Sequence, residues 1–305
     1  MATSTTPGIR DVIIIVNEGE NNKHFHGHRK GACAERQILH TVFVNKFGFS
    51  QFNADCNRDI SLGDWDHDKR PTSIQKLNAS CCIKCHIKSA QPGDNIKREN
   101  NLLVVAICSH GGVDSKGSYI SLVGEKETEQ LYISELLNFL QTCETLKNKT
   151  VIILLESCRG PQEDAGVPME VVESADTESE AAPKYQGEHV TFVPPETIQL
   201  SDVPQNFIIV YGTTPGMVSY SDVKGSWMEQ ALLEEVEKLE KSRPGEDINF
   251  MQLLTRMKGN VARRDTSGNQ QNVEAMPEAG SSGEKCVIQS EHRLTKPPML
   301  NLKKN

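Results

Sequence analysis

The stretch Val151-Ile-Ile-Leu-Leu-Glu-Ser-Cys-Arg-Gly160 decides the fold of this 305-residue chain. Its five consecutive apolar residues predict a strand that is buried on both faces, because a half-buried strand would alternate apolar and polar residues. The strand runs straight into a polar tip that holds a single cysteine, Cys158. The sequence therefore predicts one strand of a covered sheet, with a thiol just beyond its end.

A second stretch, Leu102-Leu-Val-Val-Ala-Ile-Cys-Ser-His-Gly111, has the same layout. It predicts another buried strand, which ends close to His110 and is followed at once by glycines. If the two strands are parallel and adjacent, the thiol and the imidazole meet at the carboxyl edge of the sheet, where open α/β sheets form their sites. Cys108 and Cys143 are expected to be small core residues. Cys158 differs from them because it lies beyond its apolar run, and we interpret it as a nucleophile.

The segments Ser109-His110-Gly111 and Glu156-Ser-Cys-Arg-Gly160 resemble the histidine and cysteine motifs of the caspase family. The separation, 158 − 110 = 48, is close to the roughly 50 residues found in that family. Further caspase-like segments follow in the expected order, at Asn22–Phe25, Tyr211–Gly216, Lys224–Trp227 and Ser290–Lys296. The resemblance implies a three-layer α/β/α sandwich, with a mainly parallel central sheet of about six strands and helices on both faces.

The order of apolar segments agrees with that fold, since strands and helices alternate along the first half of the chain. Strands are predicted at Asp11–Val16, Phe49–Ala54, Leu102–Cys108, Val151–Glu156 and Asn206–Tyr211, a hairpin at Gly112–Val123, and a last strand within Cys286–Leu294. Helices are predicted at Ala32–Phe47, around Ile74–Cys85, from Ser134 to Cys143, and after the capping residues Ser226 and Asp247.

An acidic segment interrupts this pattern after Gly160. Residues 160–183 contain seven acids and no Lys or Arg, which is typical of a solvated linker. The resemblance implies a large-subunit half at residues 1–160, a linker at 161–203 that is cut on activation of a zymogen, and a small-subunit half at 204–305, together forming one domain. Asp164 and Asp176 are the candidate processing sites. No adaptor domain is expected before the first strand, as in caspases with a short prodomain.

By resemblance, the Cys158 thiolate attacks the scissile carbonyl and His110 relays the proton to the leaving amine. The backbone amides of Gly111 and Cys158 would form the oxyanion hole. Caspases hold the aspartate before the scissile bond with two arginines and a glutamine. Here Arg29 matches the first arginine, Glu156 stands at the glutamine position, and Ser221 replaces the second arginine. The neighbouring Ser219 and Tyr220 belong to the same substrate-binding segment.

The loss of one cation and the gain of one anion leave three interpretations open. In the first, the chain is a protease that still cuts after aspartate. In the second, Glu156 and Ser221 turn the preference toward basic residues, as an acid does in metacaspases and paracaspases. In the third, the chain is a weakly active homologue that regulates other caspases by dimerisation. A binding module without chemistry is a further possibility, but it explains neither the His–Cys spacing nor the glycines.

Composition limits the compartment and the partners. A net charge of −8 without a basic block argues against nucleic acid, and no apolar run approaches the ~18 residues of a membrane span. The chain has nine scattered cysteines and no signal-peptide layout at its N-terminus, and both observations favour the reducing cytoplasm. The resemblance implies a role in apoptosis or a related proteolytic cascade. No cofactor or metal is expected: His24, His26 and His28 are interpreted as a solvated loop, and Cys81, Cys82, Cys85 and His86 as core packing rather than a zinc site.

Polypeptide substrates and a second copy of the chain are the expected partners, with a heterodimer with other caspases as an alternative. By resemblance, the Cys286–Leu294 strand would pair with its copy in a homodimer. Pro297 and Pro298 cannot donate ladder hydrogen bonds and are expected to end that strand early.

Overall fold

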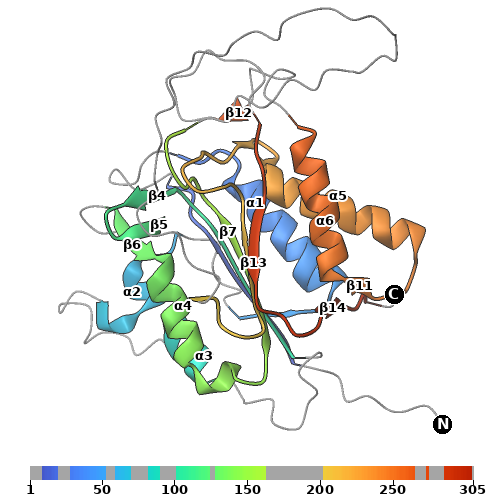
Figure 1. The fold of residues 1–305 in the computed structure, drawn as a ribbon, viewed down its shortest axis with the longest axis horizontal. Coiled ribbons are helices and arrows are strands. Elements are labelled where there is room, and N and C mark those ends of the chain that lie inside the picture. The colour runs from blue at the N-terminus through green and yellow to red at the C-terminus, as the bar shows by residue number, and fades with distance from the viewer. Residues whose placement is uncertain are drawn as a thin grey trace, which may run out of the picture.

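The computed structural model describes residues 9–19, 28–52, 59–69, 82–89, 101–123, 128–162, 202–264, 273–274 and 285–303. A six-stranded sheet forms its centre, in the order β13-β8-β7-β3-β1-β2 (Figure 1). All neighbours in this sheet are parallel except β13, which runs antiparallel to β8. The strands are β1 (Arg10–Val16), β2 (Ser50–Gln51), β3 (Leu102–Cys108), β7 (Thr150–Glu156), β8 (Phe207–Tyr211) and β13 (Gln289–His292).

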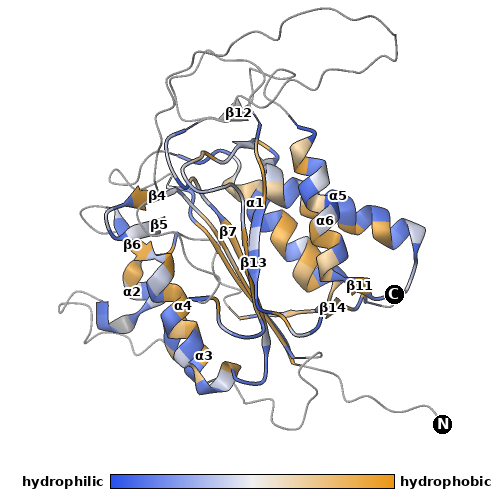
Figure 2. Cartoon of the chain, viewed as in Figure 1, coloured by the Kyte–Doolittle hydropathy of each residue, from blue (hydrophilic) through white to orange (hydrophobic). Residues whose placement is uncertain are grey.

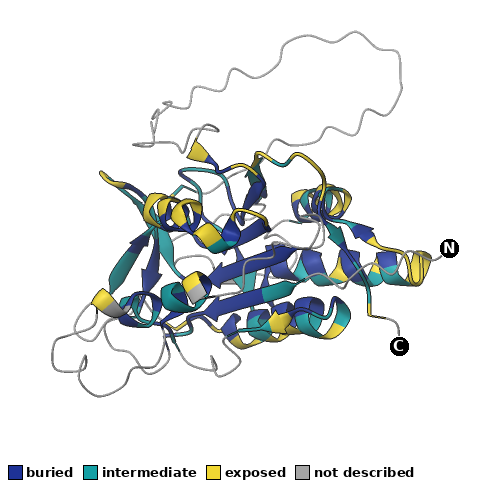
Figure 3. Cartoon of the chain, turned by 90° about the horizontal axis from the view of Figure 1, so that it is seen from below, coloured by how far each residue is buried: buried dark blue, intermediate teal, exposed yellow. Residues whose placement is uncertain are grey.

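Helices cover both faces of the sheet, so the predicted three-layer α/β/α sandwich is confirmed (Figure 1). One face carries α1 (Ala32–Leu39), α5 (Trp227–Ser242) and α6 (Phe250–Ala262); the other carries α2 (Leu62–Trp65), α3 (Ile83–Ser89) and α4 (Ile133–Thr142). The strands are apolar on both sides and lie buried between the helices, which turn their apolar sides inward (Figures 2 and 3). Along β1, Val12 and Ile14 pack under α1 and α5, whereas Ile13 and Ile15 pack under α3 and α4.

Three small sheets surround the central one. The predicted hairpin after β3 is present as β4 (Gly111–Asp114) and β5 (Gly117–Leu122), with β6 (Glu129–Tyr132) added to it. The second small sheet contains β9 (Ser221–Asp222), β10 (Gly225–Ser226) and β12 (Val273–Glu274), and β11 (Ile248–Asn249) pairs with β14 (Met299–Leu300). Short 3-10 turns lie at His67–Lys69 and Glu144–Leu146.

Several predicted boundaries shift. The helix predicted over Ala32–Phe47 is α-helical only to Leu39 and continues as a wider π-helix over His40–Lys46. The helix expected to be capped by Asp247 is capped by Asn249 instead, because Ile248 and Asn249 pair with β14 and the Asn249 side chain then accepts hydrogen bonds from the amides of Met251 and Gln252 in the first turn of α6. The last strand of the sheet ends at His292, before the two prolines.

The cysteine-rich segment packs differently from the prediction. In α3 the buried face is set by Ile83 and Ile87, Cys82 is buried just before the helix, and Cys85 is only half-buried. Ile74, Leu77 and Cys81 lie outside the described residues. Within the ranges that the structure describes, no group of three His, Cys, Asp or Glu side chains is arranged to hold a metal ion, and no helix is long and apolar enough to span a membrane.

Candidate active site

The registers of β3 and β7 bring His110 and Cys158 to the same carboxyl rim of the sheet, at the ends of two neighbouring strands. Cys108 is paired with Glu156, and the amide of Ser109 donates to the Glu156 carbonyl at 3.0 Å. His110 and Cys158 each lie two residues beyond those paired positions, on strands that are about 4.8 Å apart in such a sheet. The rim position expected from the apolar runs is therefore the position that the structure gives to both residues.

Gly111 brings the two strand ends into direct contact. A Cβ atom at Gly111 would lie 2.7 Å from the Ser157 Cβ and 2.7 Å from the Tyr119 carbonyl oxygen. Only a residue without a side chain allows the backbone after His110 to lie this close to the backbone before Cys158. The glycine next to the histidine thus has a packing role that the rim geometry requires.

We expect Gly111→Ala to lower the free energy of unfolding by about 1–3 kcal/mol, because the new methyl group would force two backbone segments apart. Gly112→Ala is the matched control: its Cβ would meet the end of the Tyr119 side chain, with 2.8 Å to the hydroxyl, and that side chain can rotate away. Urea denaturation of both variants measures the difference. An equal or smaller loss for Gly111→Ala would show that the two strand ends are not in contact as described.

The Cys158 thiol lies half-buried under the segment that precedes β9. Its Sγ is 3.8 Å from the Ser219 hydroxyl and 4.0 Å from the Ser219 carbonyl oxygen. Burial raises the pKa of the Cys158 thiol above its ordinary value, and the contacts with Ser219 only partly offset this. The resting cysteine is therefore protonated near neutral pH, and a base must remove its proton before it attacks.

The loop that follows Cys158 is tied to the second half of the chain. The Arg159 amide donates to the Met217 carbonyl at 2.9 Å, and the Gly216 amide donates to the Arg159 carbonyl at 2.8 Å. The buried Arg159 guanidinium stacks on the Tyr211 ring at 3.9 Å and donates to the Gln289 side chain at 2.8 Å. Arg159 thus connects the cysteine loop to β8 and β13.

The three residues of the predicted substrate-binding segment have different surroundings. Ser219 contacts the Cys158 thiol. Tyr220 is buried and stacks on Trp227, with ring centroids 5.0 Å apart. Ser221 is half-buried on β9, where it pairs with Ser226 of β10 on one side and with Glu274 of β12 on the other.

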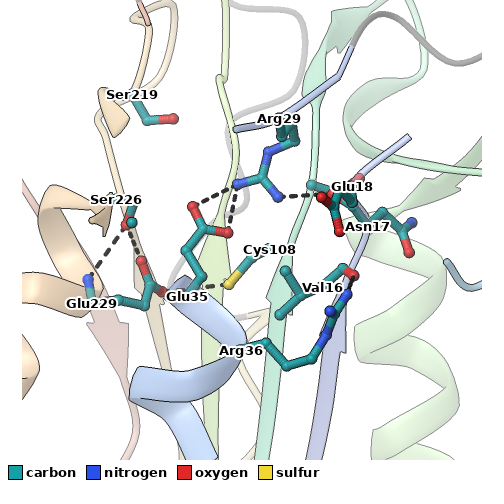
Figure 4. A network of polar contacts seen from close by, with 12 residues as sticks. Val16, Asn17, Glu18, Arg29, Glu35, Arg36, Cys108, Ser219, Ser226 and Glu229 are labelled. Carbon is teal, nitrogen blue, oxygen red and sulfur yellow. Dashed lines mark hydrogen bonds and ion pairs between the residues drawn. The ribbon is translucent and has the colours of Figure 1, made fainter. Parts of the chain in front are cut away.

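Arg29 lies buried beside α1 and is held by Glu35, an acid that the sequence interpretation missed. Its Nη2 donates to both carboxylate oxygens of Glu35 at 2.7 Å, and its Nη1 donates to the Asn17 carbonyl at 2.9 Å (Figure 4). Burial by itself lowers the pKa of the Arg29 guanidinium, but the neighbouring anions, Glu35 first, outweigh it and raise the pKa. Arg29 is a permanent cation that is already paired.

Glu156 and Glu229 complete a cluster of buried acids around this ion pair. Burial and the Glu35 carboxylate raise the pKa of Glu156 to about 8. Burial, Glu156 and Glu35 raise the pKa of Glu229 well above its ordinary value. Glu229 lies in the first turn of α5, where its backbone amide donates to Ser226 Oγ, and its carboxyl group contacts the Ser226 hydroxyl and the Cys108 thiol (Figure 4).

Sequence reasoning singled out Glu156 but missed Glu35 and Glu229, although a signal was present. Glu35 lies three and four positions before Ile38 and Leu39, and Glu229 lies three and seven positions before Leu232 and Val236. Both acids therefore occupy the apolar stripe of an amphipathic helix, where a charged residue is unusual. The candidate processing sites Asp164 and Asp176, as well as His24 and His26, lie outside the described residues; His28 contacts the Glu18 carboxylate at 3.1 Å.

Comparisons with known proteins identify the family and the fold. A family model described as the caspase domain matches residues 14–287. The chain is 27% identical to caspase-3 of Xenopus laevis over 242 residues, which cover 77% of this chain and 66% of that protein. It is 30% identical to caspase-7 of Gallus gallus over 122 residues, or 39% and 33% of the two chains. These matches thus span about one third to two thirds of the length of the curated relatives.

A solved structure shares the fold across almost the whole chain. The crystal structure of caspase-1 from Spodoptera frugiperda superposes with a TM-score of 0.59 at 19% sequence identity, covering 96% of this chain and 90% of the other. The fold, the rim geometry and the family match over residues 14–287 lead to one conclusion. The chain belongs to the caspase family of cysteine proteases.

Proposed function

We propose that this chain is a cysteine endopeptidase in which Cys158 is the nucleophile and His110 is the general base and acid. His110 takes the thiol proton while the sulphur attacks the peptide carbonyl, and it then gives that proton to the leaving amine as the C–N bond breaks. Water hydrolyses the resulting thioester and frees the sulphur. The observation that carries this proposal is the equivalent position of the two residues, each two places beyond a paired position of β3 and β7.

The amides of Gly111 and Cys158 are the proposed oxyanion donors. The tetrahedral intermediate carries negative charge on the former carbonyl oxygen, and fixed backbone N–H groups stabilise it without reorganisation. The close approach of Gly111 to Ser157 supports this pairing, because it brings the two backbone segments together at the thiol.

For specificity, we propose that the protease cuts after aspartate. Arg29 supplies a permanent positive charge beside the candidate pocket, and Ser219 adds a hydroxyl next to the thiol. The linker supports an acidic preference, since Asp164 and Asp176 lie in the interval from Arg159 to Lys184, which contains no other basic residue. Self-processing there would separate the large-subunit half (residues 1–160) from the small-subunit half (residues 204–305), with part of the linker left on each fragment.

A weakly active homologue that regulates other caspases is the second candidate. The raised pKa of the Cys158 thiol and the position of Ser219 against its sulphur favour it. A preference for basic residues is the third, because Ser221 removes a positive charge from the pocket that the resemblance implies and Glu156 adds a negative one.

A library of peptides with varied residues before the scissile bond separates these candidates. We expect the purified two-chain protein, in reducing buffer, to cut after aspartate, and the Cys158→Ala variant to show no cutting, which excludes a contaminating protease. Cleavage after Lys or Arg would support the third candidate. No turnover with any peptide, while the thiol is free and the protein is folded, would support the regulator.

The proposed partner besides substrates is a second copy of the chain, paired along the outer edge of β13. That strand ends one side of the described central sheet, and an open strand edge offers hydrogen bonds to another strand. Action in the cytoplasm, in apoptosis or a related cascade, is part of the same proposal and rests on the family and on the scattered cysteines.

A further inference from the structure

Three carboxyl groups from three different elements are enclosed together below the Cys158 thiol. Glu35 comes from α1, Glu156 from the end of β7 and Glu229 from α5, and they are 0%, 3% and 1% exposed. Among the described residues, one guanidinium, that of Arg29, is enclosed with them, and Figure 4 shows it paired with Glu35. Three buried anions beside a single cation would be far too costly, so protons must neutralise part of this cluster.

The hydrogen bonds show where the single cation is used. Arg29 binds both oxygens of Glu35, so this pair is the ionised one. The other two carboxyl groups share one neighbouring hydroxyl: Ser226 Oγ contacts the carboxyl group of Glu229 and lies near that of Glu156. A hydroxyl has one proton and can donate to only one of the two groups. Two buried carboxylates at this hydroxyl would therefore leave one of them without a donor from Ser226, which favours a proton on a carboxyl group.

The Glu156 carboxyl group has no room to turn away from this arrangement. A Cβ atom at Gly212 would lie 2.1 Å from Glu156 Oε2, so the carboxyl group packs directly on the Gly212 backbone. Its other side faces Ser219, which in turn contacts the Cys158 thiol. Glu156 is thus fixed between the acid cluster and the substrate side of the site. The charged and titratable groups that face it are Arg29, Glu35, Cys108, Cys158, Glu229 and Cys286.

We propose that Glu156 meets the substrate as a carboxylic acid, with its burial and the Glu35 carboxylate keeping the proton on it, and donates its O–H to the carboxylate of a substrate aspartate. A hydrogen bond from a carboxylic acid to a carboxylate is short and charge-assisted. Glu156 is then a specificity-determining donor rather than an anion that repels aspartate, and Glu35 and Glu229 are positioning residues. The hydrogen bond from Glu156 to the substrate is the substrate half of this inference, and it rests on the proposed function. The protonation of Glu156 is the proton half, and it rests on the cluster alone.

The pH dependence of cleavage tests the substrate half. The quantity to measure is the ratio of two kcat/KM values for an aspartate peptide, that of the parent protein over that of Glu156→Gln at the same pH. We expect this ratio to fall about tenfold per pH unit above roughly pH 8. The glutamine amide donates at every pH, and the ratio cancels the ionisation of Cys158 and His110. Glu35→Gln frees Arg29 to pair with Glu156 and should move this fall to lower pH by a unit or more. Glu234 is an exposed acid on the same helix as Glu229, and Glu234→Gln is the control. This variant should leave the pH at which the ratio falls unchanged.

Thermal unfolding in the Cys158→Ala background tests the proton half without any activity. When the pKa of a carboxyl group is higher in the folded state than in the unfolded state, the folded state binds more protons between the two pKa values. The free energy of unfolding therefore falls as pH rises through that interval. The unfolding temperature of the parent should therefore fall relative to Glu156→Gln from about pH 4.5 to about pH 8, and then stay level.

The two readouts separate the possible failures. A constant difference in unfolding temperature across this range would overturn the protonated cluster. Cleavage after aspartate with a flat ratio, or cleavage after Lys that rises with pH, would overturn the donor role of Glu156. Absence of all cleavage together with the expected unfolding curve would remove the proposed function and the substrate half, while the protonated cluster would stand.

Discussion

Replacing Cys158 with alanine is expected to lower kcat/KM for peptide hydrolysis by at least about three orders of magnitude, because alanine cannot form the covalent intermediate. His110→Gln should cause a similar loss, since the Cys158 thiol is protonated at rest and its raised pKa makes it depend on a base. Steady-state kinetics with an aspartate peptide measure both losses. Cys33→Ala, which removes an exposed free thiol from α1, is the matched control and should stay within about twofold of the parent.

The double variant distinguishes a cooperating pair from two independent contributions. If His110 acts only by activating Cys158, combining His110→Gln with Cys158→Ala should cost no more than the larger single loss. If the fold loss of the double variant instead equals the product of the two single fold losses, the residues act independently. His110 would then not activate Cys158, although both lie at the rim of β3 and β7.

The strands and the rim were predictable because they depend on local apolar runs and on one general rule of parallel sheets. The run Leu102–Cys108 and the run Val151–Glu156 became β3 and β7 with nearly the predicted bounds, and their parallel pairing placed His110 beside Cys158. The boundary errors arose where a distant segment decided the local structure. β14 pairs with Ile248 and Asn249, and so moves the start of α6 beyond Asp247.

The acid cluster was not predictable in the same way, because its energetics depend on how residues far apart in sequence are enclosed. Glu35, Glu156 and Glu229 are separated by more than 70 residues from one another. The sequence alone showed that Glu156 lies in the cysteine motif, and it predicted a conflict there: charge repulsion between a Glu156 carboxylate and a substrate aspartate. That conflict assumed an ionised Glu156, whereas burial and the Glu35 carboxylate raise the pKa of Glu156 to about 8, so that the assumption no longer holds at neutral pH.

Replacing Arg29 with methionine is expected to lower the free energy of unfolding by about 3–5 kcal/mol, because it leaves the Glu35 carboxylate buried without its cation. The Glu35 side chain is fully enclosed and both of its oxygens are bonded to Arg29. Urea denaturation at neutral pH measures the loss. The exposed Arg256 provides the control: its guanidinium lies 4.0 Å from the carboxylate of the buried Glu235, which also accepts hydrogen bonds from Lys238 and Asn260. Arg256→Ala should therefore cost less than about 1 kcal/mol.

The paired substitution gives this prediction its sharpest form. Changing Arg29 to methionine and Glu35 to leucine together removes both charges, and should recover most of the stability that the single variant loses, because a buried ion pair and an apolar pair of similar size are nearly equivalent in stability. Cleavage after aspartate should not recover with it, since no permanent cation would remain at the candidate pocket. Recovery of both stability and aspartate cleavage would show that Arg29 serves only to pair with Glu35, and that another cation binds the substrate.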